Sequence, residues 1–349
     1  MEKLSKILGD LVKLSLKNKY SFGISHGKMG LCISLFYIAY LLNSKKYIDW
    51  AEMILEDMLD KLYIPINPCN LNNYVEFAIG IDYLIGNNYI QCESEDVLSD
   101  IDDLIFKYVS NSINTNENKM FSEEMLIVYY FLKRLSSQNS NSKLFFLYKE
   151  FVIENVNNIH HRLTEDDLIE PYRYSIDYIL PFYLYLIAYL KSLNIYDYKA
   201  RMIVYDLSNY VLTKVPFSDC NKLYLLWGIL HIIKQFDLKE WENHANFLYT
   251  YIDIDKALFE ELKSNHILFE NGISSIYFIL KDLKNNFPKY SFNFNLDSIF
   301  DKISRSSLWD SIDDISYLEN HSGLINGILF PIIVMGDINL MKLYDSLNI

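Results

Sequence analysis

A pair of helical segments, recurring about every fifty residues, is the feature that most constrains how this chain folds. In each repeat, a segment that is apolar on almost all sides is followed by an amphipathic one. The apolar segments begin near Lys28, Phe77, Glu123, Tyr178, Leu223, Gly272 and Leu324. Their amphipathic partners span 47–62, 95–109, 143–155, 198–212, 239–262 and 296–303. The period predicts stacked helical pairs.

The two kinds of segment predict two different environments. Residues 29–42 contain almost no polar break, so a helix there needs cover on every side. Residues 47–62 place apolar side chains at helical spacing, from Trp50 and Ala51 to Met58 and Leu59, between acidic ones. We therefore expect an all-α fold, an α/α-toroid of seven inner and about seven outer helices.

The ends of the chain favour a closed ring over an open superhelix of helical pairs. An open array needs polar caps at its ends, yet residues 323–335 form another apolar segment. The amphipathic segment 3–16 can serve as the seventh outer helix. The Asn-rich stretches 110–118 and 136–142 are typical of loops rather than of a domain linker. The expectation is one toroid domain over residues 1–349.

Composition excludes several classes of protein. With 11 Gly and 7 Pro, the chain is poor in the turn residues of β-sandwiches and propellers. A net charge of −13 argues against a nucleic-acid partner. The N-terminus lacks the apolar core of a signal peptide, and the apolar runs 179–190 and 223–233 are too short to span a bilayer. The four cysteines contain no CxxC pair. We expect a cytoplasmic protein with no membrane span.

Glycines recur at the entries of several apolar segments. The first has Gly23, Gly27 and Gly30, the second has Gly80, the sixth has Gly272, and the seventh has Gly323 and Gly327. Glycine there lets backbones approach closely and accepts a positive φ in the incoming loop. Together with the repeat, these motifs resemble the lanthionine synthetase C-like (LanC-like) family, whose fold is an α/α-toroid of seven helical pairs.

The resemblance implies a chemistry that these residues do not support. LanC-like cyclases hold zinc with two cysteines and a histidine, and the zinc activates a substrate cysteine for addition to a dehydrated Ser or Thr. Aligned on the glycines that follow, the ligand signatures fall here on Phe269-Glu270 and on His321-Ser322. The family's acid/base histidine falls on Tyr178. The expectation is a member without the zinc cofactor, because sulfur ligands dominate tight zinc binding.

In a toroid, the N-terminal ends of the inner helices meet at one mouth, where this sequence places acids and histidines. The candidate catalytic residues are His26, Tyr178, Glu270 and His321, and the candidate substrate-binding residues are Glu76, Asp177, Glu270 and His321. Glu123 and Glu124 also fall at this end. Acids at helix N-termini are also ordinary capping partners, so both interpretations stay open.

Other groups favour structural roles. His160 and His161 are predicted to lie solvated between helices, and His231 to be a core histidine. Aromatic residues are expected mainly to fill the core, with a sugar- or peptide-stacking floor as the alternative; they are Phe36, Tyr37, Tyr40, Phe182, Tyr183, Tyr185, Tyr189 and Trp227. The acid pairs at 102–103, 166–167 and 313–314 suit solvation or capping better than a two-carboxylate glycosidase.

These observations predict a LanC-like protein of ribosomal-peptide maturation, binding a peptide substrate or a peptide-modifying enzyme rather than cyclising it. Two alternatives stay open. One is a divergent cyclase or transferase that uses the substitute residues at the mouth, and the other is a carbohydrate-active α/α-toroid.

Overall fold

The computed structural model describes residues 2–17, 20–62, 71–92, 94–112, 120–312 and 314–347. In these ranges the chain is helical and contains no β-strand, which confirms the all-α prediction. It divides into two compact units. Unit 1 comprises Met1–Asn118, Ser264–Glu270 and Asn295–Ile349, and unit 2 comprises Lys119–Lys263 and Asn271–Phe294.

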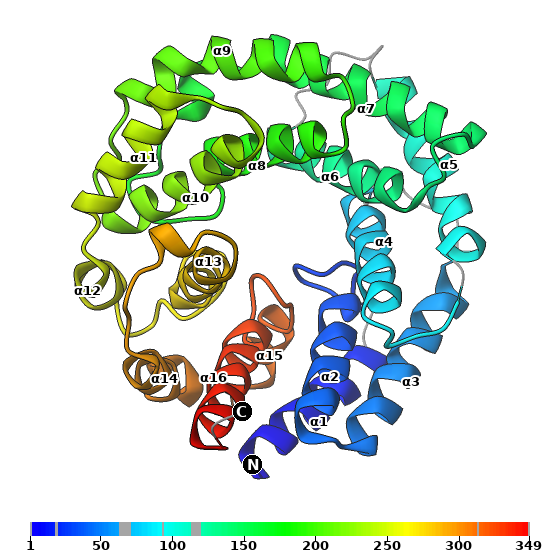
Figure 1. The fold of residues 1–349 in the computed structure, drawn as a ribbon. Coiled ribbons are helices and arrows are strands. Elements are labelled where there is room, and N and C mark those ends of the chain that lie inside the picture. The colour runs from blue at the N-terminus through cyan, green and yellow to red at the C-terminus, as the bar shows by residue number, and fades with distance from the viewer. Residues whose placement is uncertain are drawn as a thin grey trace. The chain divides into compact units, whose positions relative to one another are not determined.

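Unit 1 holds the first two and the last helical pairs of the repeat, together with the outer helix of the sixth pair. Its helices are α1 (Glu2–Lys17), α2 (Lys28–Leu42), α3 (Lys45–Lys61), α4 (Leu71–Gly86), α5 (Ser94–Ser112), α14 (Leu296–Ser304), α15 (Ile315–Asn320) and α16 (Leu329–Leu347). Helix α2 packs against α3, α4 and α16 (Figure 1). Helix α5 packs against α4, and helix α14 packs against α16.

Unit 2 repeats the same two-layer plan. Its helices are α6 (Phe121–Ser137), α7 (Lys143–Arg162), α8 (Ile179–Ser192), α9 (Asp197–Thr213), α10 (Asp219–Gln235), α11 (Lys239–Tyr251), α12 (Ile254–Lys256) and α13 (Ile273–Asn286). Helices α6, α8, α10 and α13 pack side by side in that order, and α7, α9 and α11 cover the outside of the first three (Figure 1).

The two layers follow from the sequence pattern. Helix α2 is buried from Lys28 to Phe36 without interruption, as a helix with no polar face requires. Helix α3 buries Tyr47, Ala51, Ile54, Leu55 and Met58, a single stripe at i, i+4, i+7, i+8 and i+11. The remaining face of α3 carries its charged side chains.

Several expected helix boundaries are wrong. The second apolar segment begins at Leu71 rather than near Phe77, and α7 continues to Arg162 rather than ending at residue 155. The outer segment 239–262 is not one helix: α11 ends at Tyr251, and the Asp253 side chain accepts a hydrogen bond from the Lys256 backbone N–H and so caps α12. In the last repeat α16 begins at Leu329 rather than near Leu324. Residues 321–328 instead form a loop, which is closed by a hydrogen bond of 3.1 Å from Ile328 N to His321 O.

This loop has a counterpart in the first repeat of unit 1. Lys28 N donates to Ser21 O at 2.9 Å, over the same seven-residue separation that joins Ile328 to His321. The two loops are also hydrogen-bonded to each other, from Leu324 N to Ile24 O at 3.0 Å and from Asn326 N to Ser25 O at 3.3 Å. Backbone pairing therefore joins the first and last repeats within unit 1. We call residues 21–28 and 321–328 the loop clasp.

Glycines make this approach possible because they lack a side chain. A Cβ at Gly323 would lie 1.7 Å from Ser25 O, and one at Gly30 would lie 2.3 Å from Ile24 O. The expectation of positive φ at the loop glycines is wrong, since no described glycine has one. Close contact, not backbone conformation, selects glycine here.

Replacing Gly323 with alanine should destabilise the protein by about 2–3 kcal/mol, because the added methyl group forces the two loops apart. Gly86 is the matched control: it is an exposed residue at the end of α4, and a Cβ there meets nothing within 4 Å. Gly86→Ala should leave stability unchanged or raise it by up to about 1 kcal/mol. Urea denaturation measures both free energies of unfolding, and equal stabilities for the two variants would contradict the clasp.

Gly9 is unsuitable as a surface control. It is buried on α1, and a Cβ there would lie 3.2 Å from the Trp50 ring. Gly9 is covered because α1 packs against α3, the helix that carries Trp50.

Candidate functional site

Four of the predicted site residues lie in unit 1, around the loop clasp. Glu76 of α4 is half-buried, and its carboxylate accepts hydrogen bonds from Ser25 N at 2.7 Å and from Ser25 Oγ at 2.6 Å. Both oxygens are thus engaged by the first loop. The geometry gives Glu76 a structural role in holding this loop, with little carboxylate left for a substrate.

The two predicted histidines of unit 1 are also tied to the clasp. His26 is exposed, and its Nε2 lies 2.7 Å from Asn326 Nδ2 in the partner loop. His321 is half-buried, stacks on Tyr317 with ring centroids 4.1 Å apart, and places Nδ1 3.0 Å from Tyr317 O. This contact makes Nδ1 the protonated nitrogen of a neutral His321 and leaves Nε2 as its acceptor.

Glu270 meets the clasp through its backbone. Its N–H donates to Ile325 O at 3.3 Å, and the neighbouring Phe269 ring packs on Phe330 at 4.2 Å. The structure thus brings His26, Glu270 and His321 to one pair of loops. Among the described residues, no group of three or more His, Cys, Asp or Glu side chains is arranged to hold a metal ion.

The other two predicted residues, Asp177 and Tyr178, lie in unit 2, before α8. Asp177 is exposed. Its carboxylate accepts a hydrogen bond from the Ser175 hydroxyl, and its backbone N–H donates one to the same hydroxyl. Tyr178 is buried, and burial, with the nearby Tyr210 and Glu170, raises the pKa of its phenol well above the usual value. Tyr178 therefore stays protonated at neutral pH and is poorly suited to act as a base.

A different set of side chains in unit 2 has the character of a binding surface. On α8, the residues up to Tyr189 that are not buried are Ile179, Phe182, Tyr185 and Tyr189. Their spacing of three, three and four residues places them on one stripe. Such a stripe normally carries polar residues, but here it is entirely apolar or aromatic.

Neighbouring helices extend this stripe into a continuous surface. Tyr129 of α6 lies 6.2–6.4 Å, between ring centroids, from Phe182, Tyr185 and Tyr189. Tyr185 stacks on Trp227 of α10 at 5.1 Å and 20°. All these rings are half-buried. We call Tyr129, Phe182, Tyr185, Tyr189, Trp227 and His231 the aromatic shelf.

A carboxylate from α13 lies at the edge of the shelf. Asp282 Oδ2 accepts a hydrogen bond of 2.9 Å from Trp227 Nε1, and His231 Nε2 approaches the same oxygen at 3.5 Å. Asn286 donates to the other oxygen at 2.8 Å. Burial opposes the charge of Asp282, but these three neighbours outweigh it and hold its pKa below the usual value. Asp282 therefore carries a negative charge at neutral pH.

The Tyr185 phenol of the shelf is neutral at neutral pH. Burial, with smaller effects of Tyr189 and Asp282, raises the pKa of Tyr185 to about 12. The site thus combines uncharged ring surfaces with one fixed carboxylate. This combination suits aromatic and cationic groups, which are attracted to ring faces, ring edges and negative charge.

Sequence reasoning named Phe182, Tyr185, Tyr189 and Trp227 but assigned them mainly to the core, and it did not name Tyr129. Two sequence features could have revealed the shelf: the stripe of aromatic residues on α8, and the spacing of Trp227 and His231 by one helical turn. Asp282 was missed, because only tertiary packing brings α13 beside α10. His231 is half-buried rather than a core residue, and it packs against Tyr185 and Trp227.

Two other expectations about polar groups are wrong. His160 and His161 lie in the last turn of α7 rather than between helices. His160 is not solvated: it lies 3.2 Å from Asp206 Oδ2 through Nε2 and 3.3 Å from the Tyr183 hydroxyl through Nδ1. Asp102 lies buried inside α5. Cys69 and Asp313 lie outside the described residues.

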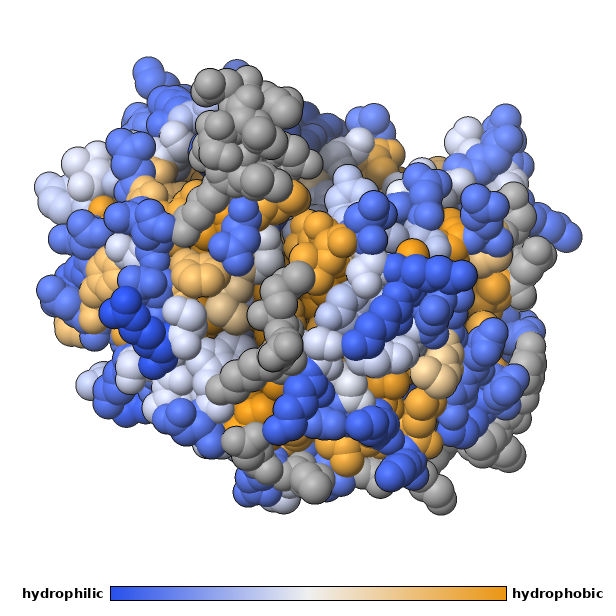
Figure 2. Space-filling model, turned by 90° about the horizontal axis from the view of Figure 1, so that it is seen from below, coloured by the Kyte–Doolittle hydropathy of each residue, from blue (hydrophilic) through white to orange (hydrophobic). Residues whose placement is uncertain are grey.

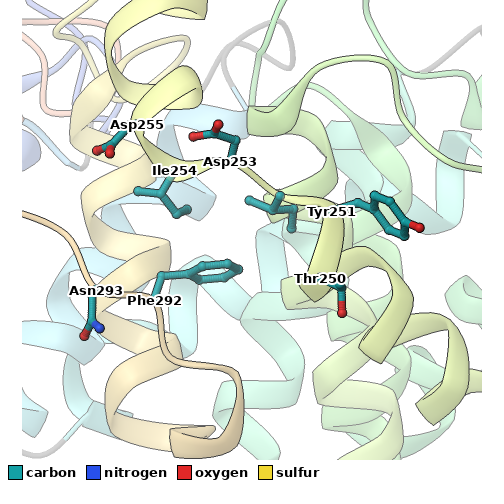
Figure 3. Close-up of a pocket in the computed structure, with 8 residues that line it drawn as sticks. Thr250, Tyr251, Asp253, Ile254, Asp255, Phe292 and Asn293 are labelled. Carbon is teal, nitrogen blue, oxygen red and sulfur yellow. The ribbon is translucent and has the colours of Figure 1, made fainter.

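Two cavities are lined by residues other than those of the shelf. One, of about 530 Å³, lies in unit 2 between the end of α11 and residues 292–293, with Asp253 and Asp255 above Phe292 (Figure 3). Asp253 is already the cap of α12. The other, of about 360 Å³, is an apolar groove between α1, α2, α14 and α16 of unit 1. Hydrophobic residues also reach the surface between hydrophilic ones on the face in Figure 2.

Comparison with known proteins leaves the family of the chain open. A scan against family models, a search of curated proteins and a search of solved structures each found no match. The resemblance to LanC-like proteins thus stays a prediction. None of the helices in the described ranges combines the length and apolar character that a membrane crossing requires.

The hydrogen bonds of Asp282 predict a pH dependence of stability. Because its pKa is lowered in the folded protein, the ionised carboxylate stabilises the fold above the ordinary pKa of about 4, and this contribution is lost as the pH falls through the folded value. Asp282→Asn should cost about 1 kcal/mol at neutral pH. The difference from wild type should shrink in acid.

Urea denaturation at a series of pH values measures this difference. Asp49→Asn, at an exposed position on α3, is the control and should leave the free energy of unfolding unchanged. A constant gap between wild type and Asp282→Asn down to the lowest pH at which the protein folds would contradict the assignment.

Proposed function

We propose that the chain is a cytoplasmic LanC-like protein of ribosomal-peptide maturation that binds a peptide without zinc and without cyclising it. The observation that carries the binding role is the aromatic shelf with its carboxylate. The glycine motifs and the helical repeat support the family. The replacement of the zinc-ligand signatures by Phe269-Glu270 and His321-Ser322 supports a non-cyclase role.

The physical case for a peptide rests on area and charge. Half-buried rings with few rotatable bonds give large contact areas at low entropic cost, which is why Tyr and Trp dominate recognition surfaces. Asp282 adds a negative charge at the edge of the rings, which attracts a basic side chain even though its oxygens already accept hydrogen bonds from Trp227 and Asn286. The shelf therefore suits a segment that carries aromatic and basic residues, and the net charge of −13 favours the approach of such a segment.

For the fold, our proposal is the closed α/α-toroid of seven helical pairs. Its support is the repeat of about fifty residues and the backbone pairing of the first and last repeats by the loop clasp. In a closed ring, the inner helices α6, α8, α10 and α13 present the shelf toward the centre.

Peptide binding at the shelf is tested with a fluorescent synthetic peptide of arginine and phenylalanine, measured by fluorescence anisotropy. Tyr185→Ala and Trp227→Leu should each weaken binding about tenfold, the usual effect of removing a central aromatic contact. Tyr205→Ala, at an exposed position on α9, is the matched control and should bind like wild type. Circular dichroism checks that every variant is folded.

Two results would overturn this proposal. One is equal binding by the shelf variants and wild type. The other is equally tight binding of a peptide of glutamate and serine, since that peptide has no aromatic side chain for the rings and the charge of Asp282 repels its carboxylates. Tyr189→Ser, at the end of the α8 stripe, keeps the test valid if Trp227→Leu does not fold.

The alternatives are enzymes. A divergent cyclase or transferase would use His26, Tyr178, Glu270 and His321, and elemental analysis returning about one zinc per chain, lost in His321→Ala, would favour it. A carbohydrate-active toroid needs two carboxylates about 5–10 Å apart. The shelf residues include no carboxylate, and the carboxylate at their edge is that of Asp282.

A further inference from the structure

Two neighbouring loops of unit 2 expose large apolar side chains to solvent. In the loop before α8, Ile169 is 59% exposed and Tyr172 is 92% exposed. In the loop before α10, Val215 is 48% exposed and Phe217 is 86% exposed. We call these four residues the loop patch. None of them belongs to the aromatic shelf.

Hydrogen bonds tie the two loops together. The Glu170 carboxylate accepts one bond from Phe217 N at 2.7 Å and another from Asn221 Nδ2 at 3.0 Å. Asn221, which is fully buried, also donates to Pro171 O at 3.1 Å. Glu170, Phe217 and Asn221 therefore fix the backbones that carry the patch.

Because the two loops are held in place, their exposed aromatic side chains cannot become buried by a movement of the loop. A side chain on a mobile loop can fold back against the protein, but Tyr172 and Phe217 are attached to braced backbone and stay in water. Leaving apolar surface in water costs free energy, and several exposed apolar side chains together usually mark a contact with another molecule. Pre-ordered loops also reduce the entropic cost of that contact.

Charged side chains beside the loop patch indicate the charge of the molecule that would contact it. Glu165 and Asp166 are exposed on the same loop, and together with Glu170 they raise the pKa of Tyr210 beyond the effect of its burial. Two cations are also present. Arg173 is exposed, while Lys214 lies over the Tyr210 ring at 4.7 Å. The carboxylates outnumber the cations, and Asp177 adds another exposed acid.

We propose that the loop patch is a docking surface for a basic, amphipathic segment of a partner protein. Its apolar side chains contact Tyr172 and Phe217, and its lysines or arginines face Glu165 and Asp166. An anionic membrane surface has the same sign of charge as these acids and is disfavoured. The docking surface is separate from the shelf, so the two can be occupied independently.

The test uses a labelled synthetic helical peptide of lysine and leucine, with fluorescence anisotropy as the readout. The double variant Tyr172→Ser/Phe217→Ser should bind it about tenfold or more weakly than wild type. Both changes leave the Phe217 backbone bond to Glu170 in place. The matched control, Tyr198→Ser/Tyr205→Ser on α9, removes two aromatic residues of 75% and 77% exposure and should bind like wild type.

Further arms examine charge and independence. Glu165→Gln/Asp166→Asn should weaken binding, added salt should do the same, and a peptide of glutamate and leucine should not bind. Trp227→Leu in the shelf should leave binding of the lysine–leucine peptide unchanged.

Three results would overturn the proposal. One is equal loss of binding in the loop-patch and α9 variants. Another is binding to vesicles of anionic lipid that requires Tyr172 and Phe217. The third is self-association of the protein alone, seen by analytical ultracentrifugation and abolished by the double variant, which would make a second copy of the chain the occupant.

Discussion

The close backbone contact between residues 21–28 and 321–328 is the constraint on which the rest of unit 1 depends. It requires glycine at positions 30 and 323. A Cβ at Gly323 would collide with Ser25 O of the opposite loop, and a Cβ at Gly30 would collide with Ile24 O of the adjoining loop and with Leu324 of the opposite one. It also uses the groups around it: Glu76 holds the first loop, and His26 faces Asn326. Glu76 and His26, which the sequence suggests as parts of a polar site, therefore contact the loops that join the first repeat to the last.

Much of the fold could be predicted from the sequence. The stripe of α3 and the fully apolar α2 follow directly from helical periodicity and predict two layers. The boundaries that failed depend on interactions outside the pattern. Asp253 begins a new helix by capping, and 321–328 stays a loop because its backbone bonds to another loop. His160 was misplaced because the pattern of α7 continues through it to Arg162.

The candidate site was harder to predict than the fold. Periodicity identifies the α8 stripe, but the same pattern is typical of a buried helix, so Phe182, Tyr185 and Tyr189 were assigned mainly to the core. These rings differ from core residues because neighbouring helices bury them only in part, and this partial burial depends on how α6, α10 and α13 pack. The link between Trp227 and Asp282 joins residues on two different helices, and no local pattern reveals it.

The central claim is that recognition belongs to the rings of α8 and α10, while the glycine loops serve to hold the fold. Photo-cross-linking tests it most directly, with an arginine–phenylalanine peptide in which one phenylalanine is replaced by a photoreactive analogue and the adducts are mapped by mass spectrometry. The account predicts adducts in the segments that contain Tyr185 and Trp227. Adducts confined to residues 21–28 and 321–328 would contradict it.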